Sequence, residues 1–161
     1  MVFEFPVMVV SIAVYAFHTM FAAIWAGSVI FVLVAVLPVA QRNGITGPDF
    51  QSILTRLVWI TRISVFVTLM TGGHLAGTLY TFENLTGTMA GNLVLLMLGL
   101  WLILAILIEV GTARAKRTLD RESVPDVSKN IRPIFITGGL AALGLLVVAG
   151  LLGAQRIFGG L

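Results

Sequence analysis

The chain has 161 residues, of which 58% are hydrophobic and 11% are charged. Soluble domains carry about 25% charged residues, so this composition excludes a soluble domain and indicates a single transmembrane domain over residues 1–161. The net charge of +3 does not indicate binding to nucleic acid, because the cations lie mostly between apolar runs, which is a signal of membrane topology. The absence of cysteine excludes disulfides, thiolate metal sites and iron–sulfur clusters.

The first apolar run extends over residues 6–39 and carries His18, one of only two histidines in the chain. A bilayer core of about 30 Å needs about 20 helical residues, so this run predicts a membrane-spanning helix of about 48 Å. Such a helix has to tilt, bend or project from the membrane, and the sequence does not distinguish among these. On its helical face His18 shares a stripe with Ala22 and Trp25, and Gly27 follows.

The second run, residues 58–80, carries the other histidine, His74. At helical spacing His74 shares a stripe with Met70 or Thr71, and it directly follows the pair Gly72 and Gly73. Glycine inside a helix costs about 1 kcal/mol relative to alanine. We therefore expect something large close to the backbone here, such as a neighbouring helix or a flat ring.

The third and fourth runs are residues 92–110 and 134–157, and these two predicted spans complete a set of four. Glu109 in the third lies at a similar depth to Arg62 in the second. The two side chains can form an ion pair, or Arg62 can extend to the membrane interface instead. Pro125, in the basic segment before the fourth run, predicts an interruption of any helix there.

The distribution of cations predicts the orientation. The connections between the first and second and between the third and fourth runs, with the adjoining turns, hold nine of the ten Lys and Arg residues and leave only Arg156. The positive-inside rule places these two connections in the cytoplasm and both termini outside. The remaining connection then lies outside, where Asn84 begins a glycosylation sequon that also occurs often by chance.

Short connections favour antiparallel neighbours, so the predicted fold is an all-α, four-helix up-down bundle in the plasma membrane. With this topology His18 and His74 lie at similar depth in the outer half, on adjacent helices. Two neutral imidazoles from two helices suit the iron of haem b. Copper is the alternative, with His18, Met70 and His74 as metal ligands, and a third reading is that each histidine only hydrogen-bonds across helices. The candidate cofactor-binding residues are His18, His74, Ala22, Trp25, Gly27, Thr71, Gly72 and Gly73.

The segments HTMFAAIWAG and TRISVFVTLMTGG resemble the copper-resistance D (CopD-like) membrane domain, whose first two helices read His…Trp-x-Gly and Arg-Phe-Ser…Thr-Gly. The matched positions cover the first half of the chain, with Ile63 in place of the usual Phe, and they are His18, Trp25, Gly27, Arg62, Ser64, Thr71 and Gly72. The resemblance implies a membrane protein of copper handling. The chain is also similar to the four-helix HemJ-type protoporphyrinogen oxidases, which bind haem, but it lacks that family's second-helix lysine.

Four functions follow from these residues. The first is a small b-type cytochrome for electron transfer with a redox partner or quinol. The second is copper transport or delivery, which would need a partner or a homo-oligomer because no succession of metal sites crosses the bilayer. The third is a haem-dependent membrane oxidoreductase, for which no strong proton-transfer group is evident. The fourth is a structural subunit of a membrane complex without a cofactor.

Overall fold

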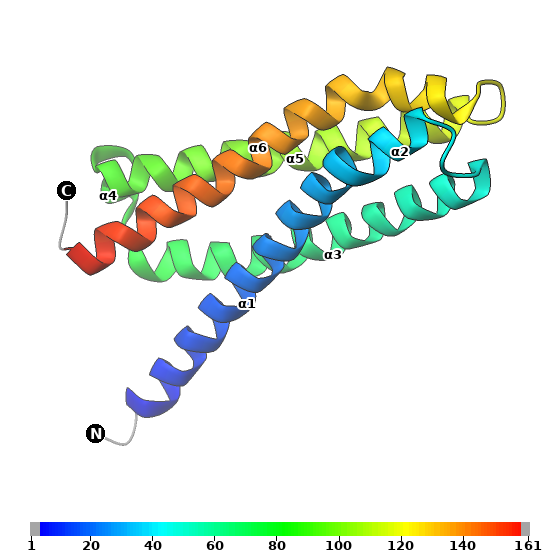
Figure 1. Cartoon of the computed structure of the whole chain (residues 1–161). Coiled ribbons are helices and arrows are strands. Elements are labelled where there is room, and N and C mark those ends of the chain that lie inside the picture. Colours follow the sequence, from blue (N-terminus) through cyan, green and yellow to red (C-terminus); the bar gives the residue numbers. More distant parts are fainter. Residues whose placement is uncertain (1–3, 159–161) are drawn as a thin grey trace.

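The computed structural model describes residues 4–158, with side chains described for residues 9–155, and this part of the chain is helical (Figure 1). Its elements are α1 (Glu4–Phe31), the π-helix η1 (Val32–Val36), α2 (Leu37–Gln41), α3 (Gly47–Leu79), α4 (Phe82–Gly87), α5 (Met89–Thr118) and α6 (Val124–Phe158). Within it, four helical stretches are long and apolar enough to cross a membrane, and they are Val9–Gln41, Gly47–Leu79, Met89–Thr118 and Val124–Gln155. The predicted all-α, four-helix membrane fold is confirmed.

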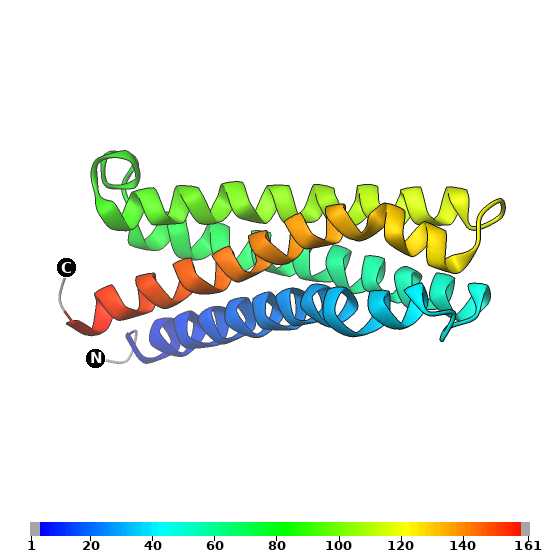
Figure 2. The same ribbon diagram turned by 45° about the horizontal axis from the view of Figure 1, so that its top comes forward.

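The long helices form an antiparallel bundle (Figures 1 and 2). Helix α1 packs mainly against α3, and α5 packs mainly against α6. Further contacts between α3 and α5 and between α1 and α6 close the ring. Both ends of the chain lie at the end of the bundle that carries α4, as an up-down topology requires.

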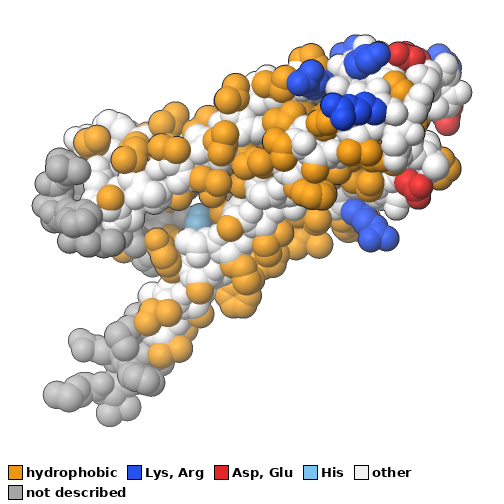
Figure 3. Space-filling view, in the orientation of Figure 1, with side chains coloured by type: hydrophobic (Ala, Val, Ile, Leu, Met, Phe, Trp, Pro, Cys, Tyr) orange, Lys and Arg blue, Asp and Glu red, His pale blue; other side chains and the backbone are white. Residues whose placement is uncertain are grey.

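The opposite end of the bundle, here called the basic end, carries the connections 42–46 and 119–123. Lys and Arg side chains gather there (Figure 3). The side chain of Arg156 lies outside the described ones. The helices continue past the apolar runs at this end, because polar turns extend them: Thr46 accepts a hydrogen bond from the Asp49 N–H at the start of α3.

The helix is interrupted at residues 119–123, directly before Pro125, and α6 begins at Val124. Pro125 therefore lies in the first turn, where its missing N–H costs no helical hydrogen bond. Asp126 in the same turn donates its backbone N–H to the Ser123 hydroxyl. Apolar-run counting finds the membrane-spanning part of a helix and does not detect such a capped polar start.

The core is concentrated towards the basic end, where all four long helices meet. Its largest fully buried side chains are Trp25, Phe50, Phe135, Leu37, Leu54, Leu104, Ile108 and Ile131. Towards the α4 end, the first half of α1 diverges from the other helices (Figure 1), and its large side chains such as Ile12 and Phe17 are exposed. The bundle is thus closed at one end and splayed at the other.

The overlong first run is one tilted helical rod, α1–η1–α2, which crosses α3 (Figure 1). Its wide turn η1 ends two residues before Pro38, and the Leu37 N–H donates to the Val32 carbonyl five residues earlier. Proline has no N–H, and its ring opposes the carbonyl four residues earlier, here Val34. A π-turn at this place accommodates Pro38 without ending the helix.

Candidate functional site

A stripe of hydroxyl side chains runs along the face of α3 that points into the bundle. Three of its members are buried and the fourth is half-buried, in the order Thr61, Ser64, Thr68 and Thr71. The spacing of three or four residues places them on one face of the helix. Here this stripe is called the hydroxyl stripe, and it is the polar lining of an otherwise apolar interface.

Tryptophan N–H groups from two neighbouring helices bind this stripe. The Trp25 Nε1 of α1 donates to Thr61 Oγ1 at 3.1 Å, and the Trp101 Nε1 of α5 donates to Thr68 Oγ1 at 2.9 Å. A buried N–H without a partner costs about 1–3 kcal/mol, so the buried pairing of Trp25 holds α1 against α3. The pairing of the half-buried Trp101 adds a weaker link from α5.

The imidazole of His18 makes a third contact with the stripe, since its Nδ1 lies 2.9 Å from Thr71 Oγ1. Thr71 has a single hydroxyl hydrogen, which it donates to the Val67 carbonyl at 2.6 Å. This arrangement favours Thr71 Oγ1 as the acceptor and His18 as the donor, that is, the tautomer with its proton on Nδ1 and a lone pair on Nε2. An imidazole held in this way is oriented in one tautomer, as metal-binding histidines commonly are.

Gly72 makes this position of the imidazole possible. A Cβ atom at residue 72 would lie 2.9 Å from His18 Cε1, which is closer than side-chain atoms pack. A Cβ at Gly73 would meet nothing within 4 Å. The expectation that a large group lies close to this glycine pair is thus met at Gly72 by the imidazole of His18.

His74 lies near this contact along α3 but points elsewhere. Successive helical residues are turned by about 100°, so positions 72 and 74 project about 160° apart. The His74 side chain is exposed, and within residues 9–155 its imidazole makes no hydrogen bond. The structure therefore brings His18 together with Thr71 and Gly72, and it does not bring the two imidazoles face to face.

The other candidate residues divide in the same way. Met70 is 54% exposed and lies one turn before His74. Ala22 is half-buried, whereas Trp25 is buried and its indole N–H is already bonded to Thr61. Gly27 lines a separate groove between α1 and α3. Among the described residues, no group of three or more His, Asp or Glu side chains converges as a metal site.

Arg62 and Glu109 form the ion pair that their depths allowed. Arg62 Nε donates to Glu109 Oε1 at 2.7 Å, and Nη2 donates to Oε2 at 3.1 Å, which is a two-bond contact between α3 and α5. Both side chains are substantially exposed on the outer surface of the bundle, so the pair is no part of the His18 site.

Trp101, Thr61 and Thr68 were missed as polar partners by reasoning from the sequence. The signal for two of them was present, because hydroxyl residues recur at helical spacing through the second apolar run. Their donors come from other helices, and a single sequence does not show which tryptophan meets which threonine.

Comparisons with protein-family models, curated proteins and solved structures find no match to this chain. The resemblance to CopD-like and HemJ-type proteins therefore stays a prediction.

Proposed function

We propose that this chain is a small b-type cytochrome of CopD-like type in the plasma membrane, which binds haem through His18. The observation that supports it is the fixed imidazole. Nδ1 is hydrogen-bonded to Thr71, which leaves the lone pair of Nε2 available to coordinate a metal ion. The surrounding pair of membrane-spanning helices is mostly apolar. Histidine is a common axial ligand of haem iron, and haem would supply one-electron transfer to a redox partner or quinol.

The residues around His18 have separate tasks in this proposal. Thr71 holds the tautomer and the direction of the ring, and Gly72 leaves the room that the ring needs. His18 itself is half-buried between these residues, so its ring is partly accessible from outside the bundle. The proposal therefore gives the ligand role to His18, and a bond from His74 would need a different relative position of α1 and α3.

Copper handling is the second candidate, and one observation favours it. Met70 and His74 are exposed and lie four residues apart on α3, so a thioether and an imidazole are neighbours on one face. Both are ligands that Cu(I) accepts. Two donors do not fill a copper site, so this function requires a further ligand from a partner or from a second copy of the chain.

The test is an absorption spectrum and metal analysis of the protein purified from haem-replete membranes. We expect a Soret band that is lost in His18→Ala. His74→Ala distinguishes a two-histidine centre, which loses the band, from a one-histidine centre, which keeps it. Bound copper that is lost in Met70→Leu supports the second candidate. A colourless, metal-free protein that copurifies with other subunits contradicts both and indicates a structural subunit.

A further inference from the structure

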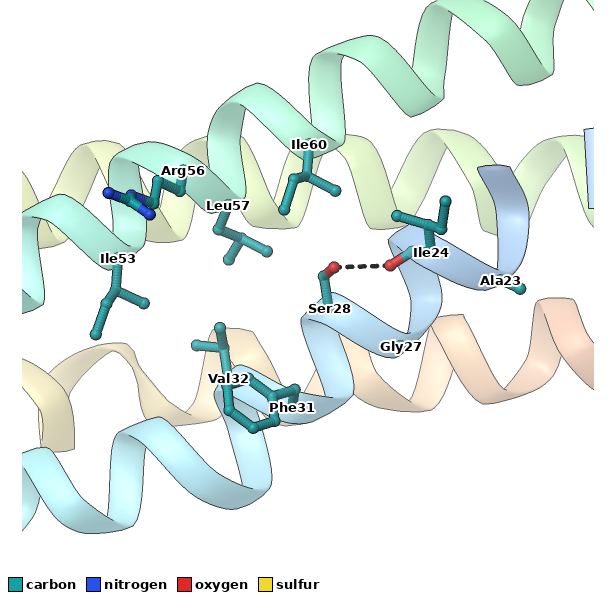
Figure 4. A pocket seen from close by; sticks show the side chains of 10 residues that line it. All are labelled: Ala23, Ile24, Gly27, Ser28, Phe31, Val32, Ile53, Arg56, Leu57 and Ile60. Atoms are coloured by element: carbon teal, nitrogen blue, oxygen red, sulfur yellow. Dashed lines mark hydrogen bonds between the residues drawn. The ribbon is translucent and has the colours of Figure 1, made fainter. Parts of the chain in front are cut away.

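A groove of about 460 Å³ lies between α1 and α3, away from the His18 site. Ile53, Leu57 and Ile60 of α3 point towards α1 across it (Figure 4). The α1 side contributes the helix turns between Ala23 and Val32. A side chain at Gly27 would meet nothing within 4 Å, so this residue leaves the groove open. The walls are apolar except for Ser28 and one cation, Arg56.

A second hollow adjoins the groove on the surface of α3 and shares Arg56 with it. Its other lining residues are Pro48, Gln51, Ser52 and Thr55, so it is polar where the groove is apolar. Arg56 thus stands at the junction of an apolar and a polar surface. It forms no ion pair within residues 9–155, and no carboxylate lines either hollow.

The position of Arg56 along α3 corresponds to the headgroup layer. Arg56 lies 23 residues before Leu79, the last residue of α3, which is about 35 Å along a helix. A bilayer core is about 30 Å thick. When Leu79 marks one boundary of the hydrocarbon, Arg56 lies just beyond the other, and the groove from Leu57 towards Ala23 lies inside the hydrocarbon.

We propose that this surface binds one anionic phospholipid from the leaflet at the basic end. The phosphate lies at the Arg56 guanidinium, with Gln51 and Ser52 as further hydrogen-bond donors, and an acyl chain follows the groove past Gly27 and Ile60. Basic pockets between helices at the cytoplasmic side suit anionic headgroups. A zwitterionic lipid is disfavoured because the ammonium of its headgroup would find no carboxylate among the lining residues.

Native mass spectrometry of the delipidated full chain tests this, with phosphatidylglycerol and phosphatidylcholine offered in equal amounts. We expect a single phosphatidylglycerol adduct on the wild-type protein. Arg56→Gln should lower its affinity about fivefold, the effect of one cation near an anionic surface. Gly27→Leu should abolish the adduct by filling the groove. The result does not depend on a cofactor at His18.

Two variants are matched controls. Arg42→Gln removes an exposed cation at the same end, and Gly99→Leu adds the same side chain at an exposed helical glycine of α5 with no neighbour within 4 Å. Both should keep the phosphatidylglycerol adduct. Equal adducts of the two lipids, equal losses in Arg42→Gln and Arg56→Gln, or a lipid-free dimer that covers the groove would each overturn the proposal. Circular dichroism establishes that each variant is folded.

Discussion

Gly72 and Gly73 are adjacent, identical in sequence terms, and different in what they contact. At Gly72 the missing side chain gives the imidazole of His18 its place, whereas Gly73 faces open space. Alanine is favoured over glycine in a helix by about 1 kcal/mol, so each glycine destabilises α3 by about this amount. Only at Gly72 does the absence of a side chain allow a contact, the one with the His18 imidazole. The pair therefore offers a matched comparison at a single site.

We predict that Gly72→Ala displaces the His18 ring and breaks its hydrogen bond with Thr71. The closest atom is the tip of a rotatable side chain, so the ring moves rather than the helix. The loss of about 1 kcal/mol from the bond is offset by the helix preference of alanine, so the Tm should change little. The measurement is the ¹⁵N NMR signal of the His18 imidazole, which should lose its pattern of a protonated Nδ1.

Gly73→Ala is the control for this comparison and should leave the His18 signals unchanged. The same two variants also separate packing from ligand binding, since only Gly72→Ala should weaken a Soret band that depends on His18. Equal spectra for the two variants would contradict the role given to Gly72.

Among the elements, α3 connects the bundle through the hydroxyl stripe. Its threonines accept from Trp25 and His18 of α1 and from Trp101 of α5. Because Thr68 and Thr71 donate their own hydrogens to carbonyls within α3, their oxygens act as acceptors towards the neighbouring helices. These directional hydrogen bonds fix how α1 and α5 are rotated and shifted relative to α3. Apolar packing alone would permit several such arrangements.

The rotation of α1 relative to α3 depends on η1, because the extra residue in this π-turn rotates all residues of α1 that precede it, Trp25 and His18 included. We predict that deletion of Val34 combined with Pro38→Ala converts the π-turn to α-helix and keeps the fold. Val34 is 65% exposed, so its removal costs no core contact. The Leu37 N–H then bonds a carbonyl four residues earlier, and Trp25 keeps its direction towards Thr61. The measurement is thermal unfolding in detergent, and we expect a Tm close to that of the parent.

Deletion of Ile24, also combined with Pro38→Ala, is the matched control, since this residue is also exposed but lies in regular α-helix. It rotates the residues before it by about 100° and takes His18 away from Gly72. A loss of stability on deleting Val34 as large as that on deleting Ile24 would show that the π-turn itself is required.

At the scale of the whole molecule, hydropathy and charge predicted the fold because both are carried by long runs. Four spans, their alternation and the Arg62–Glu109 pair follow from residue counts along helices. The direction of His74 relative to His18 does not, since it depends on how α1 crosses α3. The wide turn at Val32–Val36 does not either, because a proline at residue 38 is compatible with a kink, a helix end or a π-turn. A period of 3.6 residues gives the face of each helix, but it does not give the crossing angle that decides which faces meet.

The charge distribution predicts the orientation of the protein in the membrane. Single introduced cysteines can test it, because the chain has no cysteine of its own. We predict that Glu83→Cys, in α4, reacts with a membrane-impermeant maleimide in intact cells, and that Asp120→Cys reacts only after permeabilisation. Both positions are exposed, and both substitutions remove one negative charge. The physical reason is that nine of the ten cations lie towards the end that carries Asp120, and cationic segments are retained in the cytoplasm. The reverse labelling pattern would place Arg56 and its lipid groove in the outer leaflet, and the His18 site would then open towards the cytoplasm.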